Sequence, residues 1–175
     1  MTPASPWTCL TPWPREQEGP VQQDLVADEP ARKAVARFLG LEDVTLLSAR
    51  LTLQAWLDGA EIAGEMEARF TRLCGLTLEP FEVLLDEPIF LRALPAGSAH
   101  APAPPSGEVD LQLEDEDPPE VFGPEGVDLC DLVVQTLALA LDPFPRKPGA
   151  VFEPPQAQLE DSPFGILARM TDPKE

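Results

Sequence analysis

The cysteine at position 74 carries the most reactive side chain in the centre of the chain, within 70-FTRLCGLTLEPFEV-83. It could be a metal ligand, a nucleophile, a redox switch or a small apolar packing residue. Zinc held by cysteine requires about four ligands at short spacing, and a nucleophilic cysteine requires a neighbouring base. No close ligand or histidine accompanies Cys74 in the sequence. We therefore expect Cys74 to be a packing residue, although a distant carboxylate partner and a redox role stay open.

The other two cysteines, Cys9 and Cys130, are far from Cys74 and from each other, and the sequence contains no C-x-x-C. An odd, scattered set argues against a disulfide framework and is typical of a reducing cytosol. Cys130 is expected to be a packing residue. The first residues, MTPASPWTCLTPWP, lack the basic start and apolar run of a signal peptide, and no window offers an 18-residue apolar span. These features predict a soluble cytoplasmic protein without membrane contact.

Few other residues in the sequence could take part in catalysis. The single histidine, His100, falls in an Ala/Pro-rich loop, and tyrosine is absent. The sequence contains no P-loop, no dinucleotide-binding glycine motif, no H-E-x-x-H and no G-x-S-x-G. Its carboxylates fall in solvated runs, where a pKa is rarely raised. We expect no catalytic residue, no metal, no cofactor and no small-molecule substrate.

The charge of the chain narrows the choice of partner. Twelve Lys and Arg against 31 Asp and Glu give a formal net charge of −19. Proteins that grip nucleic-acid phosphates over their whole surface usually have the opposite sign. A basic protein, such as a ribosomal protein, is a more natural partner, and the charge also serves solubility.

Two helices are expected from capping residues and apolar spacing. Asp28 can cap the first, Pro30 suits its first turn and Gly40 its end, with an apolar stripe of Ala31, Ala34, Val35, Phe38 and Leu39. The second covers 128–142 and is apolar on most sides, which predicts that it is largely buried. A short third helix is expected to begin at Ser162-Pro163.

Alternation of apolar and polar residues predicts strands at 44–57, 61–70, 82–93 and 108–113. Asp58-Gly59 marks a hairpin turn, and Pro88 marks a bulge or a sheet edge. The expected fold is α+β, with a small antiparallel, barrel-like sheet, two main helices and a short C-terminal helix.

We expect one domain, 1–175. Clusters among its 22 prolines and runs of charged residues mark the segments outside the expected helices and strands. Residues 1–20 form an extended Pro/Trp-rich N-terminus, 96–107 a flexible Ala/Pro-rich loop and 114–126 an acidic loop.

Three stretches together resemble the YceD-like family of large ribosomal RNA subunit accumulation proteins, in its alphaproteobacterial-type branch. They are 67-EARFTRLCGLTLEPFEVLLDEPIFLRALP-95, 127-VDLCDLVVQTLALALDPFPRKPGA-150 and 161-DSPFGILARM-170. The residues that carry the motifs are Cys74, Leu78, Glu79, Pro80, Asp128, Leu129, Pro143, Pro163, Phe164 and Leu167. Many members have paired cysteines in the central turn, whereas this sequence has Cys74 alone.

The resemblance implies a non-enzymatic accessory factor for large-subunit biogenesis that supports accumulation or processing of large-subunit ribosomal RNA. A ribosomal protein or a large-subunit precursor is the implied partner, and direct RNA contact stays open. Two alternatives remain: an RNA-processing enzyme, and an acidic interaction scaffold unrelated to ribosomes.

The flanks of the second helix are the hypothetical partner-binding residues. They are the acids Glu114, Asp115, Glu116, Asp117 and Glu120 before it and the bases Arg146 and Lys147 after it. The acids would attract a basic ribosomal protein, and the bases could touch RNA phosphate. If these acids are not needed, the exposed sheet face around Arg50, Thr52 and Trp56 is the next candidate.

Overall fold

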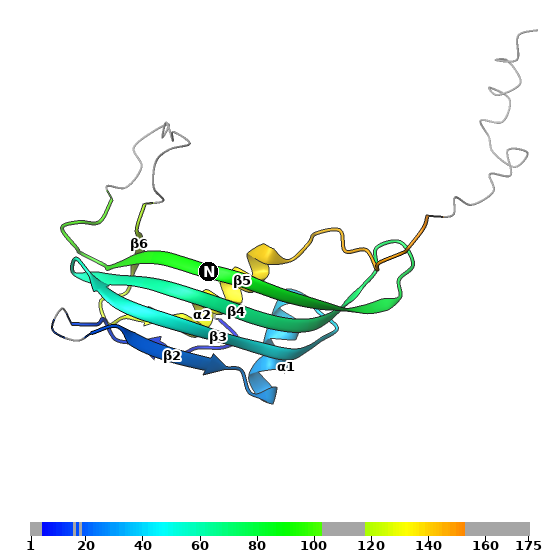
Figure 1. Ribbon diagram of the computed structural model, residues 1–175, viewed down its shortest axis with the longest axis horizontal. Helices are drawn as coiled ribbons and strands as arrows, with labels where there is room; N and C mark the ends of the chain where they lie inside the picture. The colour runs from blue at the N-terminus through cyan, green and yellow to red at the C-terminus, as the bar shows by residue number, and fades with distance from the viewer. Residues whose placement is uncertain (1–4, 16, 18, 103–117, 153–175) are drawn as a thin grey trace, which may run out of the picture.

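A five-stranded sheet with both helices against one face forms the body of the computed structural model, which describes residues 5–15, 17, 19–102 and 118–152 (Figure 1). The strand order is β2-β3-β4-β5-β6, and the strands are Val21–Val26, Asp43–Trp56, Gly59–Leu73, Pro80–Pro95 and Glu120–Phe122. The first four pair antiparallel, whereas β6 runs parallel to β5. The α+β class is confirmed. The sheet is mixed rather than antiparallel, and it does not close into a barrel among the described residues.

The long strands β3, β4 and β5 follow the predicted alternation. Leu47 and Leu51 of β3 and Phe70 of β4 are buried and belong to one core cluster. Ser48 and Arg50, which alternate with the buried residues of β3, line the outer face instead. Trp56 pairs with Gly59, so the hairpin loop is Leu57-Asp58, one residue earlier than predicted. Among the described residues, β5 has no partner on its second side at Pro88, as expected for a sheet edge.

Helix α1, Glu29–Leu39, begins and ends where the sequence predicted. The Asp28 carboxylate accepts a hydrogen bond from the Ala31 N–H at 2.9 Å, and Gly40 closes the helix in the left-handed conformation at φ 66°. The predicted stripe is only partly right. Val35 and Ala36 are buried, whereas Phe38 is exposed.

Helix α2, Leu129–Ala140, is capped by Asp128, whose carboxylate accepts from the Asp131 N–H at 3.1 Å. One face packs into the core through Leu129, Cys130, Val133, Val134 and Leu137. The expectation that the helix is largely buried is only partly right, because Leu139 is 89% exposed. Neither helix in the described part of the chain is long and apolar enough to cross a membrane.

Several elements were not predicted, and some predicted ones lie outside the described residues. Strand β2 was missed, as was the two-stranded pairing of β1, Leu10–Thr11, with β7, Val127–Asp128. Strand β6 occupies part of the acidic loop predicted at 114–126. The predicted strand at 108–113 and the C-terminal helix are outside the described residues.

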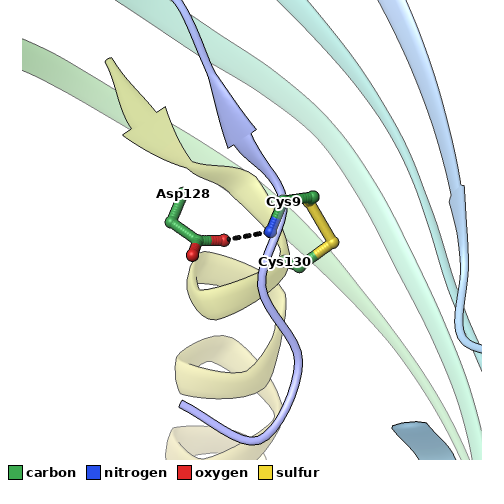
Figure 2. A group of neighbouring side chains, drawn as sticks. All are labelled: Cys9, Asp128 and Cys130. Carbon is green, nitrogen blue, oxygen red and sulfur yellow. Dashed lines mark hydrogen bonds between the residues drawn. A yellow bond between two sulfur atoms is a disulfide. The ribbon is translucent and has the colours of Figure 1, made fainter. Parts of the chain in front are cut away.

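The structure joins Cys9 to Cys130 in a disulfide, with 5.2 Å between the two Cα atoms, which corrects the expectation that all cysteines are free (Figure 2). The physical reason is the β1–β7 pairing. It places Leu10 opposite Asp128, and this register brings Cys9 beside the first turn of α2. Cys74 stays free and buried, as expected of a packing residue.

Candidate functional site

The turn that carries Cys74 links β4 to β5 and has a defined backbone. The Cys74 N–H donates to the Glu79 carbonyl, and the Leu78 N–H donates to the Cys74 carbonyl, each at 2.9 Å. Leu78 has a φ of 58°, a left-handed conformation that is uncommon for leucine, and its side chain is 73% exposed. Pro80 then begins β5. The Leu-Thr-Leu-Glu-Pro run therefore shapes a tight turn that presents an apolar side chain to solvent.

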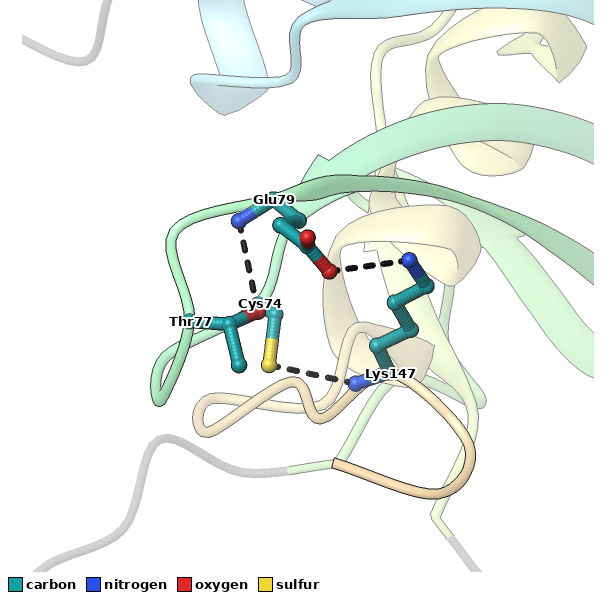
Figure 3. A network of polar contacts seen from close by, with 4 residues as sticks. All are labelled: Cys74, Thr77, Glu79 and Lys147. Carbon is teal, nitrogen blue, oxygen red and sulfur yellow. Dashed lines mark hydrogen bonds and ion pairs between the residues drawn. The ribbon is translucent and has the colours of Figure 1, made fainter. Parts of the chain in front are cut away.

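The segment after α2 docks onto this turn. The Gly75 N–H donates to the Pro145 carbonyl at 2.8 Å, and the Lys147 N–H donates to the Cys74 Sγ at 3.3 Å. The Lys147 ammonium also pairs with the Glu79 carboxylate at 2.9 Å (Figure 3). Two of the three stretches that carry the family resemblance thus meet at one place in the fold.

This setting changes the acidity of the Cys74 thiol. The Lys147 N–H lowers its pKa most, followed by the Thr77 hydroxyl and the N–H groups of Leu76 and Thr77, while burial acts in the opposite direction. The resulting pKa is about 6 instead of 9.0, so the thiolate is the main form at neutral pH. Cys74 has no exposed surface, and its sulfur accepts the Lys147 N–H, so it links the turn to the segment that follows α2.

The lowered pKa predicts a pH dependence of stability. A group whose pKa is depressed in the folded state stabilises that state fully above its unfolded pKa, and loses this contribution as pH falls towards the folded value. The unfolding free energy of the native chain minus that of Cys74→Ser should therefore increase as pH rises from about 6 to 9.0. Urea denaturation of both proteins across this range measures it. A difference that is constant with pH would mean that the buried thiol stays protonated.

The outer face of the sheet, away from both helices, holds a second group of polar residues. They surround a hollow of about 460 Å³, lined in part by the acids Asp24, Glu65, Glu67 and Asp86 and by Arg50. We call this group the acidic hollow. Arg50 pairs with Asp24 at 3.1 Å, whereas Glu65, Glu67 and Asp86 form no ion pair with any described residue.

The strand register makes the acidic hollow electrostatically unfavourable for folding. Glu67 on β4 lies directly opposite Asp86 on β5. Glu65, two residues before Glu67 on β4, lies on the same face of the sheet. Like charges directly opposite each other on neighbouring strands destabilise a sheet. The Glu67–Asp86 pair therefore costs stability, whereas Glu65 lies directly opposite Arg50 on β3.

One end of the same face is aromatic. The Arg92 guanidinium lies 5.3 Å from the centre of the Trp56 ring and 5.8 Å from that of Phe90, and it pairs with Glu61 at 3.2 Å. Phe90 is 64% exposed. The open sheet face therefore combines an acidic centre with an aromatic end.

The structure describes only three of the predicted partner-binding residues, Glu120, Arg146 and Lys147. Glu114, Asp115, Glu116 and Asp117 lie outside the described residues, as do Pro163, Phe164 and Leu167. Glu120 is exposed on β6, opposite Ala93. Arg146 is exposed, whereas Lys147 forms an ion pair with Glu79. The two residues of the predicted basic pair therefore have different surroundings.

Neither a family model, nor a curated protein, nor a solved structure matches the chain.

The sequence missed the acidic hollow because its members are spread over four strands. The alternation around 61–70 does predict that Glu65 and Glu67 face outward, and the sequence also indicates an exposed face around Arg50. What was missing was the register that sets Asp86 opposite Glu67.

Proposed function

We propose that this protein is a non-enzymatic, cytoplasmic accessory factor of large ribosomal subunit biogenesis, which holds a basic ribosomal protein on the acidic hollow. The resemblance to YceD-like proteins supports the pathway, and the net charge of −19 supports the sign of the partner. The observation that carries the proposal is the like-charge pair Glu67 and Asp86, with Glu65 beside it, on a sheet face that neither α1 nor α2 covers.

A basic protein suits this surface better than RNA does. Lysine and arginine side chains would relieve the repulsion among the three carboxylates, whereas phosphate groups would increase it. The aromatic end formed by Trp56 and Phe90 adds apolar area beside the charged centre, a combination typical of protein interfaces. The alternatives of an RNA-processing enzyme and of a scaffold unrelated to ribosomes become outcomes of the test.

The test neutralises the acidic hollow without touching the Arg50–Asp24 pair. The variant Glu65→Gln, Glu67→Gln, Asp86→Asn should lose binding to basic large-subunit ribosomal proteins, and the remaining binding should depend less on salt. The same variant should unfold at an equal or higher urea concentration than the native chain, because repulsion across β4 and β5 is removed. Affinity isolation with mass spectrometry, then direct titration at two salt concentrations, measures the first effect.

The matched control changes the charge by the same amount elsewhere. Glu42, Asp43 and Glu125 are exposed and lie outside the acidic hollow, so Glu42→Gln, Asp43→Asn, Glu125→Gln should keep the native affinity. An equal loss of binding in the acidic-hollow variant and in this control would mean that net charge alone causes the effect. Metal-dependent RNA cleavage would favour the enzyme, and enrichment of basic proteins unrelated to ribosomes would favour the scaffold.

A further inference from the structure

Three ligand-bearing residues cluster where the N-terminal segment meets α2. The sulfur atoms of Cys9 and Cys130 and a carboxylate oxygen of Asp128 all lie within 4.8 Å of one another (Figure 2). Cys9 comes from the N-terminal segment, whereas Asp128 and Cys130 flank the first residue of α2. Two thiols and a carboxylate are a donor set that zinc accepts.

Backbone contacts join the segments of this cluster in addition to the S–S bond. The Cys9 N–H donates to the Asp128 carboxylate at 2.8 Å, and the Leu129 N–H donates to the Cys9 carbonyl at 3.3 Å. Leu10 pairs with Asp128 in the adjoining ladder. None of these contacts uses the S–S bond, so we expect them to keep the two thiols of the reduced chain near each other.

We propose that, once the disulfide is reduced, Cys9, Cys130 and Asp128 bind one zinc ion, with a water or an outside ligand in the fourth position. Three protein ligands with an open fourth position are a recurrent zinc arrangement. Because the sulfurs are either bonded to each other or bonded to the metal, the site exists only in the reduced chain. The inference is independent of the acidic hollow, which is on the opposite face of the sheet.

Asp128 is already oriented for this role. Its Oδ1 accepts N–H bonds from Cys9 and Asp131, and a carboxylate has further lone pairs that can bind a metal. Hydrogen bonds of this kind fix the direction of a metal ligand. The N-terminus of α2 also favours the negative charge that two thiolates and a carboxylate leave around one zinc ion. Cys9 is only half-buried, so the site has an entry path.

The redox step balances with a phosphine as reductant. The S–S bond breaks, the phosphine gives two electrons and becomes a phosphine oxide with the oxygen of water, and the two sulfurs take up two protons. Zinc binding then releases the thiol protons as two Zn–S bonds form. Hydrogen peroxide reverses the outcome: it takes two electrons from the two thiolates and, with two protons, becomes two water molecules, while the disulfide re-forms and the zinc ion leaves.

The experiment reduces the full chain with a phosphine, removes the reductant without oxygen and adds zinc alone. The amount of bound zinc is measured by inductively coupled plasma mass spectrometry, and the zinc affinity by competition with a chromogenic chelator. We expect one zinc per reduced chain and none per oxidised chain. Cobalt in place of zinc should give the near-ultraviolet absorption of thiolate–metal bonds, which reports the ligands directly.

Variants test each ligand. Cys9→Ser and Cys130→Ser should each abolish stoichiometric zinc. Asp128→Asn keeps an N-cap acceptor for α2, yet should weaken zinc by about tenfold or more, because even outer partners of metal ligands cost that much when removed. Cys74→Ser, at the one free thiol among the described residues, is the matched control and should bind zinc like the native chain.

A reduced native chain that holds no more zinc than the Cys9→Ser, Cys130→Ser double variant would overturn the proposal. Zinc that is lost in Cys74→Ser and kept in the double variant would also overturn it. The circular dichroism spectrum of each variant shows whether it is folded, so that loss of zinc binding can be distinguished from unfolding.

Discussion

Leu137→Ala is expected to lower the free energy of unfolding by about 2–5 kcal/mol, the range for a leucine removed from a filled core. Leu137 has no exposed surface and lies on the face of α2 that packs into the core cluster. The substitution loses the burial of several methyl and methylene groups and leaves a cavity that the long strands cannot readily fill. Urea denaturation monitored by circular dichroism measures the change.

The same helix supplies the control. Leu139 is two residues further on and 89% exposed, so Leu139→Ala removes the same atoms and retains the helix propensity, yet should change stability by no more than about 0.5 kcal/mol. Equal small effects at both positions would mean that α2 is not docked through Leu137. A large effect at Leu139 instead would place the apolar contact on the opposite face.

Local periodicity explains why the long strands and α1 were predicted well. Alternation across β3 and β4 reflects one buried face, and the Asp28 cap and the Gly40 terminus act within one turn of the residues that they serve. Such signals are visible in the sequence because each depends on near neighbours. In α2 the pattern was ambiguous. Leu129, Val133 and Leu137 share a buried face, but the many apolar residues around it do not show where that face ends, and Leu139 is exposed.

Long-range contacts explain what the sequence did not predict. Strands β1 and β7 have two residues each, too few for a periodic pattern, and they are recognisable only because they pair with each other. The link between Cys9 and Cys130 depends on that pairing. Within the candidate site, Glu79 and Lys147 were both singled out, but nothing in their separate stretches indicated that they form an ion pair.

The Cys9→Ser, Cys130→Ser double variant is expected to be less stable than the oxidised native chain by about 2–5 kcal/mol. The two cysteines are 121 residues apart, so the bond closes a long loop and removes much of the freedom of the unfolded chain. Both proteins are unfolded in urea with a chelator present, so that metal binding to thiols contributes nothing to the difference.

The loss should begin at the N-terminal segment. Without the covalent link, this segment is held mainly by the two-residue β1–β7 ladder, the bonds around Asp128 and the packing of Trp7 and Trp13 against the core. Amide exchange at residues 9–11 should therefore quicken more than exchange in β3 or β4, whose ladders and core contacts are unchanged. Reductant should reproduce the effect in Cys74→Ser, which retains the Cys9–Cys130 bond, and leave the double variant unchanged. Equal stability of the double variant and the oxidised chain would show that β1, β7 and the two tryptophans suffice to hold the N-terminal segment against α2.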